Sequence, residues 1–200
     1  MALAKATLEA AFLGTFTAMD SILDGTGDRY MADETAQAMA DYILAGDTKT
    51  ADTGAAPAGA YTGSGQGKMS IDGSSLASDL YATFTAGYDN DALAAHMAAD
   101  IDKACSADKT VSESSKGTVT TSSGTATFGG PAEGKFSGSK ATIEAKLKKC
   151  FADMDEMTSG GNGHFASEWA SAVDSYLKAG QITVELKSPF TKGTGKGTIA

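Results

Sequence analysis

The sequence predicts an α+β protein made of three tandem helix–helix–strand–strand repeats in a pseudo-threefold arrangement, with helical hairpins packed on short β-strands. The segment Lys5–Ala10 returns almost verbatim as Lys140–Ala145. Apolar residues follow each copy at steps of four, four and three, which is the spacing of one face of an α-helix. A glycine-rich, strand-like segment closes the first copy at 61–71 and the last copy at 191–199.

The first repeat is expected to cover residues 1–72. Its first helix is predicted from Ala4 to Leu23 and is ended by glycines at 25 and 27. A second helix is predicted from about residue 33 to 45, followed by Gly46 in the C-terminal cap position. A short β-tolerant segment at 47–50 and a loop through Pro57 then lead to the glycine-rich strand.

The second repeat, residues 73–139, is the divergent copy. Its helices are expected at 76–88 and 91–105, followed by a strand at 109–111. Polar and apolar residues alternate at 118–121 and 125–128, on both sides of a Ser-Ser-Gly turn. That pattern predicts an inserted β-hairpin.

The third repeat, residues 140–200, follows the order of the first. Helices are predicted at 139–157 and 165–178, and Trp169 and Tyr176 lie on the inner face of the second one. A strand with period-two alternation follows at 182–186, before the glycine-rich end.

A repeat of about 65 residues is marginally stable alone, and an isolated strand pair does not form a stable sheet. We therefore expect the strands to pair between repeats or with another subunit, while the helical hairpins cover one face of the sheet. An open array of repeats is the alternative to the pseudo-threefold arrangement.

Charge and composition narrow the classes of partner. The net charge is −9 and Arg29 is the only arginine, which disfavours binding to nucleic acid. No run approaches the length of a membrane-spanning helix, and Glu9 interrupts the apolar N-terminal residues where a signal peptide would be continuous. Cys105 and Cys150 are expected to be free, partly buried thiols, because two cysteines make no disulfide framework.

The glycine-rich segments do not fit a phosphate-binding loop. Such a loop needs glycine where Thr62 stands and a hydroxyl residue where Met69 stands. The favoured interpretation is a strand whose alternating small residues allow close packing.

Two acidic loops and two histidines are the remaining candidates for chemistry. The loop from Asp24 to Asp28 lacks the glycine and the glutamate of an EF-hand, so helix capping is the favoured role, with an adventitious cation left open. The segment 89–91 is equally incomplete. His96 and His164 show no zinc-ligand spacing, and Ser167 near His164 does not make a catalytic triad. We predict no enzyme activity, no cofactor and no metal site.

The C-terminal part of the chain resembles a known class of proteins. The helix end at 172–180, the strand start at 182–184 and the Gly/Thr-rich terminus at 193–199 resemble small structural proteins of tailed bacteriophages. The resemblance implies a virion component, located in the virion after assembly in the host cytoplasm.

The leading hypothesis is a non-enzymatic virion protein that decorates or cements the capsid. Its expected partners are other virion proteins, capsid or tail subunits, with a homo-oligomer in the particle left open; nucleic acid and membrane are not expected partners. The alternatives are a neck, tail or baseplate adaptor and, from another class, a small-ligand or glycan-binding module. The candidate partner-contact residues lie on the inserted hairpin and on the last regular strand: Val119, Thr121, Thr125, Thr127, Phe128, Ile182 and Val184.

Overall fold

The computed structural model describes residues 3–22 and 24–200. Within them, the order helix–helix–strand–strand occurs three times, which confirms the α+β class. The helices are α1 (Lys5–Met19), α2 (Gly27–Ala45), α3 (Gly73–Thr85), α4 (Asn90–Ser106), α5 (Lys140–Asp155) and α6 (Gly161–Ala179). The strands are β1 (Thr48–Ala56), β2 (Gly59–Met69), β3 (Val111–Thr121), β4 (Gly124–Ser137), β5 (Gln181–Leu186) and β6 (Lys192–Ile199).

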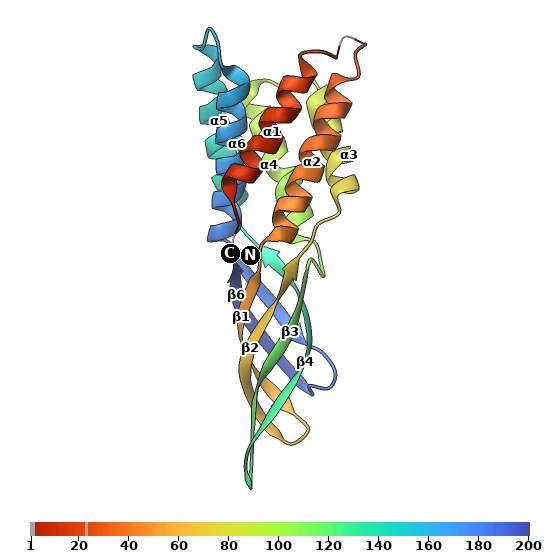
Figure 1. Cartoon of the computed structure of the whole chain (residues 1–200), viewed down its shortest axis with the longest axis vertical. Helices are drawn as coiled ribbons and strands as arrows, with labels where there is room; N and C mark the ends of the chain where they lie inside the picture. Colours follow the sequence, from red (N-terminus) through yellow and green to blue (C-terminus); the bar gives the residue numbers. More distant parts are fainter. Residues whose placement is uncertain (1–2, 23) are drawn as a thin grey trace.

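The molecule is long, with a helical bundle at one end and a β-barrel at the other (Figure 1). Each helix packs beside its neighbours in the chain, and α6 packs against α1, so the helices form a ring. The expectation that helical hairpins cover a sheet face is therefore wrong. The strands close on one another and bury their own inner face, so the bundle stacks on the end of the barrel instead.

All neighbouring strands in the barrel are antiparallel, in the order β1-β2-β3-β4-β5-β6 with β6 returning to β1. Three of the six pairings join different helix–helix–strand–strand segments, as the sequence predicted. The same register recurs in each hairpin and in each pairing between segments. The hairpin pairs are Thr48 with Gly67, Val111 with Gly134 and Ile182 with Gly197; the pairs between segments are Met69 with Val111, Phe136 with Ile182 and Ile199 with Thr48.

Glycines face inward on β2 and β6 because the barrel is narrow. A Cβ atom built on Gly67 would lie 2.6 Å from the Cα of Glu113 on the neighbouring strand. Carbon atoms in contact normally stand about 3.5–4.0 Å apart, so no larger residue fits without moving the backbone. The interpretation of the Gly-x-Gly-x-Gly segments as close-packing strands is confirmed.

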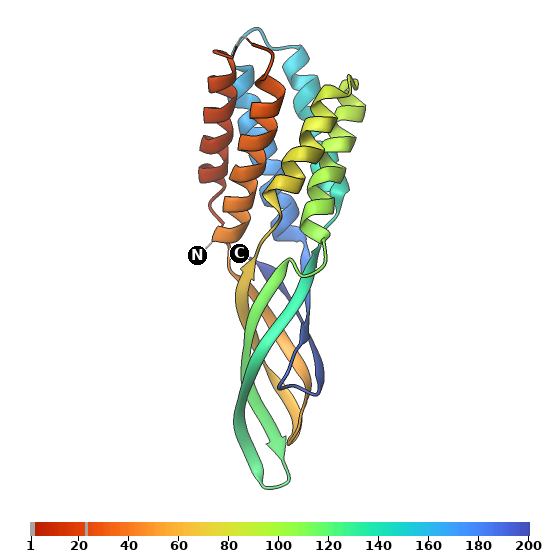
Figure 2. The same ribbon diagram turned by 90° about the vertical axis from the view of Figure 1, so that its right-hand side faces the viewer.

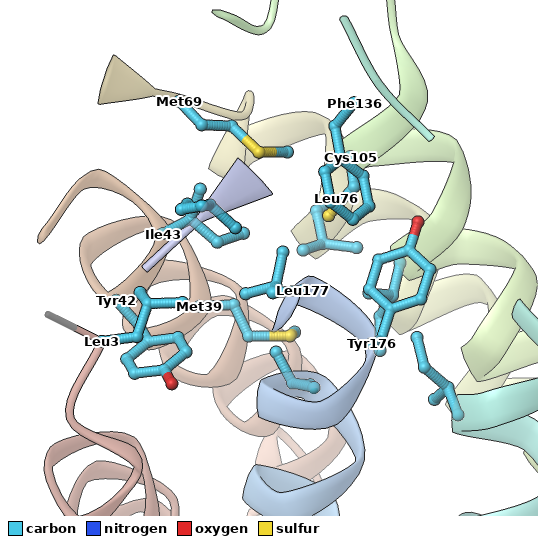
Figure 3. Packing of buried hydrophobic residues seen from close by; sticks show 14 of the residues in the cluster. Leu3, Met39, Tyr42, Ile43, Met69, Leu76, Cys105, Phe136, Tyr176 and Leu177 are labelled. Atoms are coloured by element: carbon cyan, nitrogen blue, oxygen red, sulfur yellow. The ribbon is translucent and has the colours of Figure 1, made fainter. Parts of the chain in front are cut away.

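The centre of the helical bundle is aromatic. The ring of Trp169 lies 4.8 Å from Phe12 and 5.2 Å from Phe165, centroid to centroid, and Trp169 is fully buried. At the junction, Met69 and Phe136 from the barrel meet Ile43 and Leu177 from the bundle (Figure 3). One hydrophobic core therefore runs from the bundle into the top of the barrel.

Several element boundaries differ from the predicted ones. Helix α1 ends at Met19, and Leu23, its expected last residue, lies outside the described residues. Helices α2 and α6 begin at Gly27 and Gly161, earlier than predicted. The predicted starts lie after the glycines because glycine is unfavourable in a helix interior, but Gly27 and Gly161 occupy the first position of each helix.

The strands are longer than predicted: β4 has 14 residues. The segments 118–121 and 125–128 do form a hairpin, but they are the far halves of β3 and β4 and continue the same ladder. The predicted insertion is thus a lengthening of a hairpin that all three segments possess. None of the described helices has the length and apolar character needed to cross a bilayer.

Candidate functional site

The end of the barrel away from the helices, here called the barrel tip, consists of the β3–β4 hairpin from 117 to 131 together with Tyr61 and Phe190. The hairpin extends beyond the other strands (Figure 2). Strand β4 pairs with β3 from Gly124 to Gly134, but with β5 only from Ala132 to Ser137. The stretch 124–130, the β4 edge, therefore has a partner strand on one side only within the described structure.

The upper end of the β4 edge is closed. The backbone N–H of Lys187 donates to the carbonyl oxygen of Pro131 at 2.9 Å, and Pro131 has no N–H to offer. Below this point no described backbone group bonds to the outer side of the strand. An edge of about seven residues, roughly 23 Å long at 3.3 Å per residue, is left open.

The barrel tip carries no charge. The 16 residues from 117 to 132 include no Asp, Glu, Lys or Arg, although 20% of the chain is charged. Proteins usually protect an exposed strand edge with lysine, proline or a bulge. Here Pro131 protects only the upper end, so the chemistry of the β4 edge favours pairing with another strand.

Three of the sequence-predicted contact residues are buried in the barrel, which corrects the prediction. Val119, Ile182 and Val184 are 1%, 0% and 0% exposed. Strand β5 pairs with β4 and β6, so its alternating pattern marks a face turned into the barrel, not a face offered to a partner.

The other predicted residues do lie at the barrel tip. Thr125 and Thr127 are exposed on the outer face of the β4 edge. Thr121 is half-buried, and its hydroxyl oxygen accepts a hydrogen bond of 3.2 Å from the backbone N–H of Ser123, so it shapes the turn.

Phe128 supports the β4 edge from inside the barrel. Its ring lies 5.1 Å from Phe190 and 6.2 Å from Tyr61, and Tyr61 and Phe190 are 4.7 Å apart, all edge to face. Such pairs stabilise by about 0.5–1.5 kcal/mol beyond area burial. The sequence predicts Phe128 as a contact residue but does not predict the trio, because the three rings come from β2, β4 and the β5–β6 loop.

The prediction that the acidic loops cap helices is confirmed for one of the two. Asp89 is the N-terminal cap of α4 and accepts from the backbone N–H of Ala92 at 2.8 Å. Asp24 does not cap α2: its carboxylate accepts from the backbone N–H of Thr26 at 3.1 Å, in the turn before the helix, and the cap residue Thr26 makes no side-chain hydrogen bond to the helix. The hydrogen bond from the Thr26 hydroxyl holds the pKa of Asp24 below its ordinary value. Across residues 3–22 and 24–200, no group of three or more His, Cys, Asp or Glu side chains could hold a metal ion.

The histidines pack against or lie close to neighbouring side chains, and the cysteines are buried. His96 stacks on Tyr88 at 4.1 Å, and His164 lies 3.6 Å from Asp153. Cys105 and Cys150 are free, as predicted, and both are buried. Burial raises the pKa of Cys105 to about 12 and that of Cys150 to about 11, so both stay as thiols at neutral pH.

No protein-family model matches the chain, and neither a curated protein nor a solved structure matches it.

Proposed function

We propose that the chain is a non-enzymatic structural protein of a tailed-bacteriophage virion, a decoration or cement protein that docks on the capsid shell. The observation that carries the proposal is the β4 edge: an open strand edge on an uncharged tip, at the far end of a long molecule with net charge −9. Such an edge serves to add a strand from a partner.

The proposal includes a pseudo-threefold repeat, which the strand registers support. The pairs of Gly67, Gly134 and Gly197 are Thr48, Val111 and Ile182, at the same place in each hairpin. A chain with such a repeat mimics a trimer, and it suits a threefold or quasi-threefold position on a shell.

Two hydrogen bonds between helices follow the same symmetry. Tyr42 donates to Asp174 at 2.5 Å, and Tyr176 donates to Asp102 at 2.6 Å, so each tyrosine reaches the second helix of another segment. Tyr42 and Tyr176 precede the buried residues Ile43 and Leu177, and in α4 the residue in the same place, before the buried Cys105, is Ala104.

The third hydrogen bond of the set is missing, because alanine stands at both its donor and its acceptor position. The residue of α2 that corresponds to Asp102 and Asp174 is Ala40, and its partner by symmetry would be Ala104. Joint loss of donor and acceptor is what divergence from a repeat produces, because a buried polar group without its partner is costly.

The β3–β4 hairpin breaks the pseudo-threefold at the barrel tip, since it alone extends past the other hairpins (Figure 2). This gives the molecule a single docking strand. An extended segment of a shell subunit pairs with the β4 edge through backbone hydrogen bonds, and Thr125 and Thr127 contact its side chains.

Lysine substitutions at the β4 edge test the proposal. The double variant Thr125→Lys/Thr127→Lys places charge on exposed side chains and disfavours edge pairing. Thr62→Lys is the matched control, because Thr62 is exposed on β2, which has partner strands on both sides. Particles lacking the protein are mixed with each variant, and bound protein is counted after sedimentation.

The wild type and Thr62→Lys are expected to cover the head in many copies, and the double variant is expected to bind at least about tenfold less, a loss of about 1.4 kcal/mol. Equal binding by all three contradicts the docking site. A few copies at one vertex would support the adaptor alternative instead. Light scattering of the free protein shows whether the β4 edge pairs with a second copy. Thermal shifts with nucleotides or glycans would favour a ligand-binding module.

A further inference from the structure

The barrel holds a polar cluster between its junction with the bundle and the barrel tip, and Tyr61 belongs to both the cluster and the tip. Thr50 and Asp52 on β1, Glu113 and Ser115 on β3, and Tyr61 on β2 all point inward, and Asp52 and Glu113 are 1% and 5% exposed. In the equivalent third segment the inward positions of β5 are apolar: Ile182, Val184 and Leu186.

No described cation faces these two carboxyl groups. Besides Tyr61, the inward residues of β2, β4 and β6 offer no titratable group, and no described ion pair includes Asp52 or Glu113. Between the aromatic trio and the junction, those inward residues are Gly63, Gly65, Gly67 and Met69 on β2, Gly130, Ala132, Gly134 and Phe136 on β4, and Gly193, Gly195, Gly197 and Ile199 on β6. Two buried negative charges without a counter-charge are strongly unfavourable.

The number of hydrogens available for the hydrogen bonds of the cluster indicates that the two carboxyl groups are not both charged. The Thr50 hydroxyl oxygen lies 2.7 Å from Oδ1 of Asp52 and 2.6 Å from Oε2 of Glu113. A hydroxyl has one hydrogen and can donate it along one of these contacts. The Ser115 hydroxyl donates to Oδ2 of Asp52, so Tyr61, 2.8 Å from Ser115, supplies the next hydrogen in that chain. The second carboxyl contact of Thr50 therefore needs a hydrogen from a carboxyl group.

We propose that Asp52 and Glu113 share one proton, held on Glu113, and that this makes the barrel a pH-responsive element. The Glu113 carboxylic acid donates to Thr50, and Thr50 donates to the Asp52 carboxylate. Both oxygens of Asp52 accept hydrogen bonds, which suits the charged member. The other oxygen of Glu113, Oε1, is buried and has no hydrogen-bond partner among the described residues, which costs less for the carbonyl of a neutral acid than for a carboxylate.

A proton fits the spacing better than a metal ion does. Calcium lies about 2.3–2.6 Å from each ligand oxygen and so stands between them. The contacts of Thr50 with the two carboxyls, at 2.7 and 2.6 Å, are direct hydrogen-bond distances. Glycine makes room for the pair: a Cβ on Gly195 would lie 3.0 Å from Cγ of Asp52.

The shared proton sets the direction of the pH response. In the unfolded chain both carboxyls are ionised at neutral pH, so unfolding releases the proton. The folded state binds one more proton, and its stability therefore falls as pH rises. The unfolding constant is expected to increase about tenfold per pH unit across the neutral range, where the unfolded chain has released the proton that the folded state keeps.

The test compares urea unfolding of the wild type, Glu113→Gln and the control Glu133→Gln at several pH values. Glutamine can donate to Thr50 without a titrating proton, and Glu133 is exposed on the outer face of β4. The ratio of unfolding constants, wild type over Glu113→Gln, should rise about tenfold per pH unit, because the histidines and other carboxyls cancel in the ratio. Glu133→Gln should follow the wild type. A constant ratio overturns the proposal.

A second measurement does not depend on the variant folding. Infrared spectra of the wild type at neutral pH should contain the carbonyl band of a buried protonated carboxyl, and Glu113→Gln should lack it. A wild-type spectrum without the band overturns the proposal. Added calcium provides a further check. If calcium raises the unfolding midpoint of the wild type but not that of Glu113→Gln, a metal ion neutralises the pair and the proposal is overturned.

Discussion

Replacing Gly134 by alanine should destabilise the barrel strongly although it adds one methyl group. The added Cβ would lie 2.6 Å from the Cα of Val184. Relief to an ordinary contact requires the backbones of β4 and β5 to separate by about 1 Å, since carbons in contact stand about 3.5–4.0 Å apart. Overpacking of this kind costs about 1–3 kcal/mol, and a backbone neighbour places Gly134→Ala near 3 kcal/mol. For a chain of this size that is a fall in melting temperature of about 6–12 °C.

The matched control is Gly14→Ala on the exposed face of α1, where an added Cβ meets nothing within 4 Å. Alanine in a helix interior is about 1 kcal/mol better than glycine, so this variant should melt higher than the wild type. Calorimetry and urea unfolding measure both. If Gly134→Ala melts within about 1 °C of the wild type, the explanation of the glycine-rich strands as close-packing elements is refuted.

Three further outcomes follow from individual contacts. Tyr176→Phe removes a hydrogen bond to the Asp102 carboxylate and should cost about 2 kcal/mol in urea unfolding; an unchanged midpoint would show that this bond does not stabilise the bundle. The buried thiols Cys105 and Cys150, whose pKa values are about 12 and about 11, should not react with a maleimide in the native protein at pH 8 and should react after unfolding, by mass spectrometry. Asp72→Ala removes the cap of α3 and should lower the melting temperature at pH 7. The pKa of Asp72 is lowered by its bonds to Ser75 and Ser74, so this difference should disappear as pH falls through that pKa; a difference that persists in strong acid would contradict the cap.

The helices and their order could be predicted because the apolar steps from Leu8 and from Ile143 have a period that only a helix explains. Barrel closure could not. The pattern Ile182–Leu186 shows that one face of the strand is buried, but the same alternation suits an open sheet and a closed barrel. Closure depends on long-range pairs such as Thr48 with Ile199.

Only the part of the candidate site that depends on local sequence could be predicted. The turn residues and Thr125 and Thr127 were found from local chemistry. Whether the outer side of β4 has a partner depends on the length of β5, which ends at Leu186, far from it in sequence. The carboxyl pair of Asp52 and Glu113 is 61 residues apart and gave no local signal.

Amide hydrogen exchange of the chain, free and bound to phage heads that lack it, tests the proposed docking most directly. Free amides along 124–130 that point away from β3 should exchange quickly, because no described strand pairs with them on that side. Binding should protect these amides and leave those of the helical bundle unchanged. Protection confined to the bundle, with the β4 edge still exchanging quickly, would contradict docking through the barrel tip.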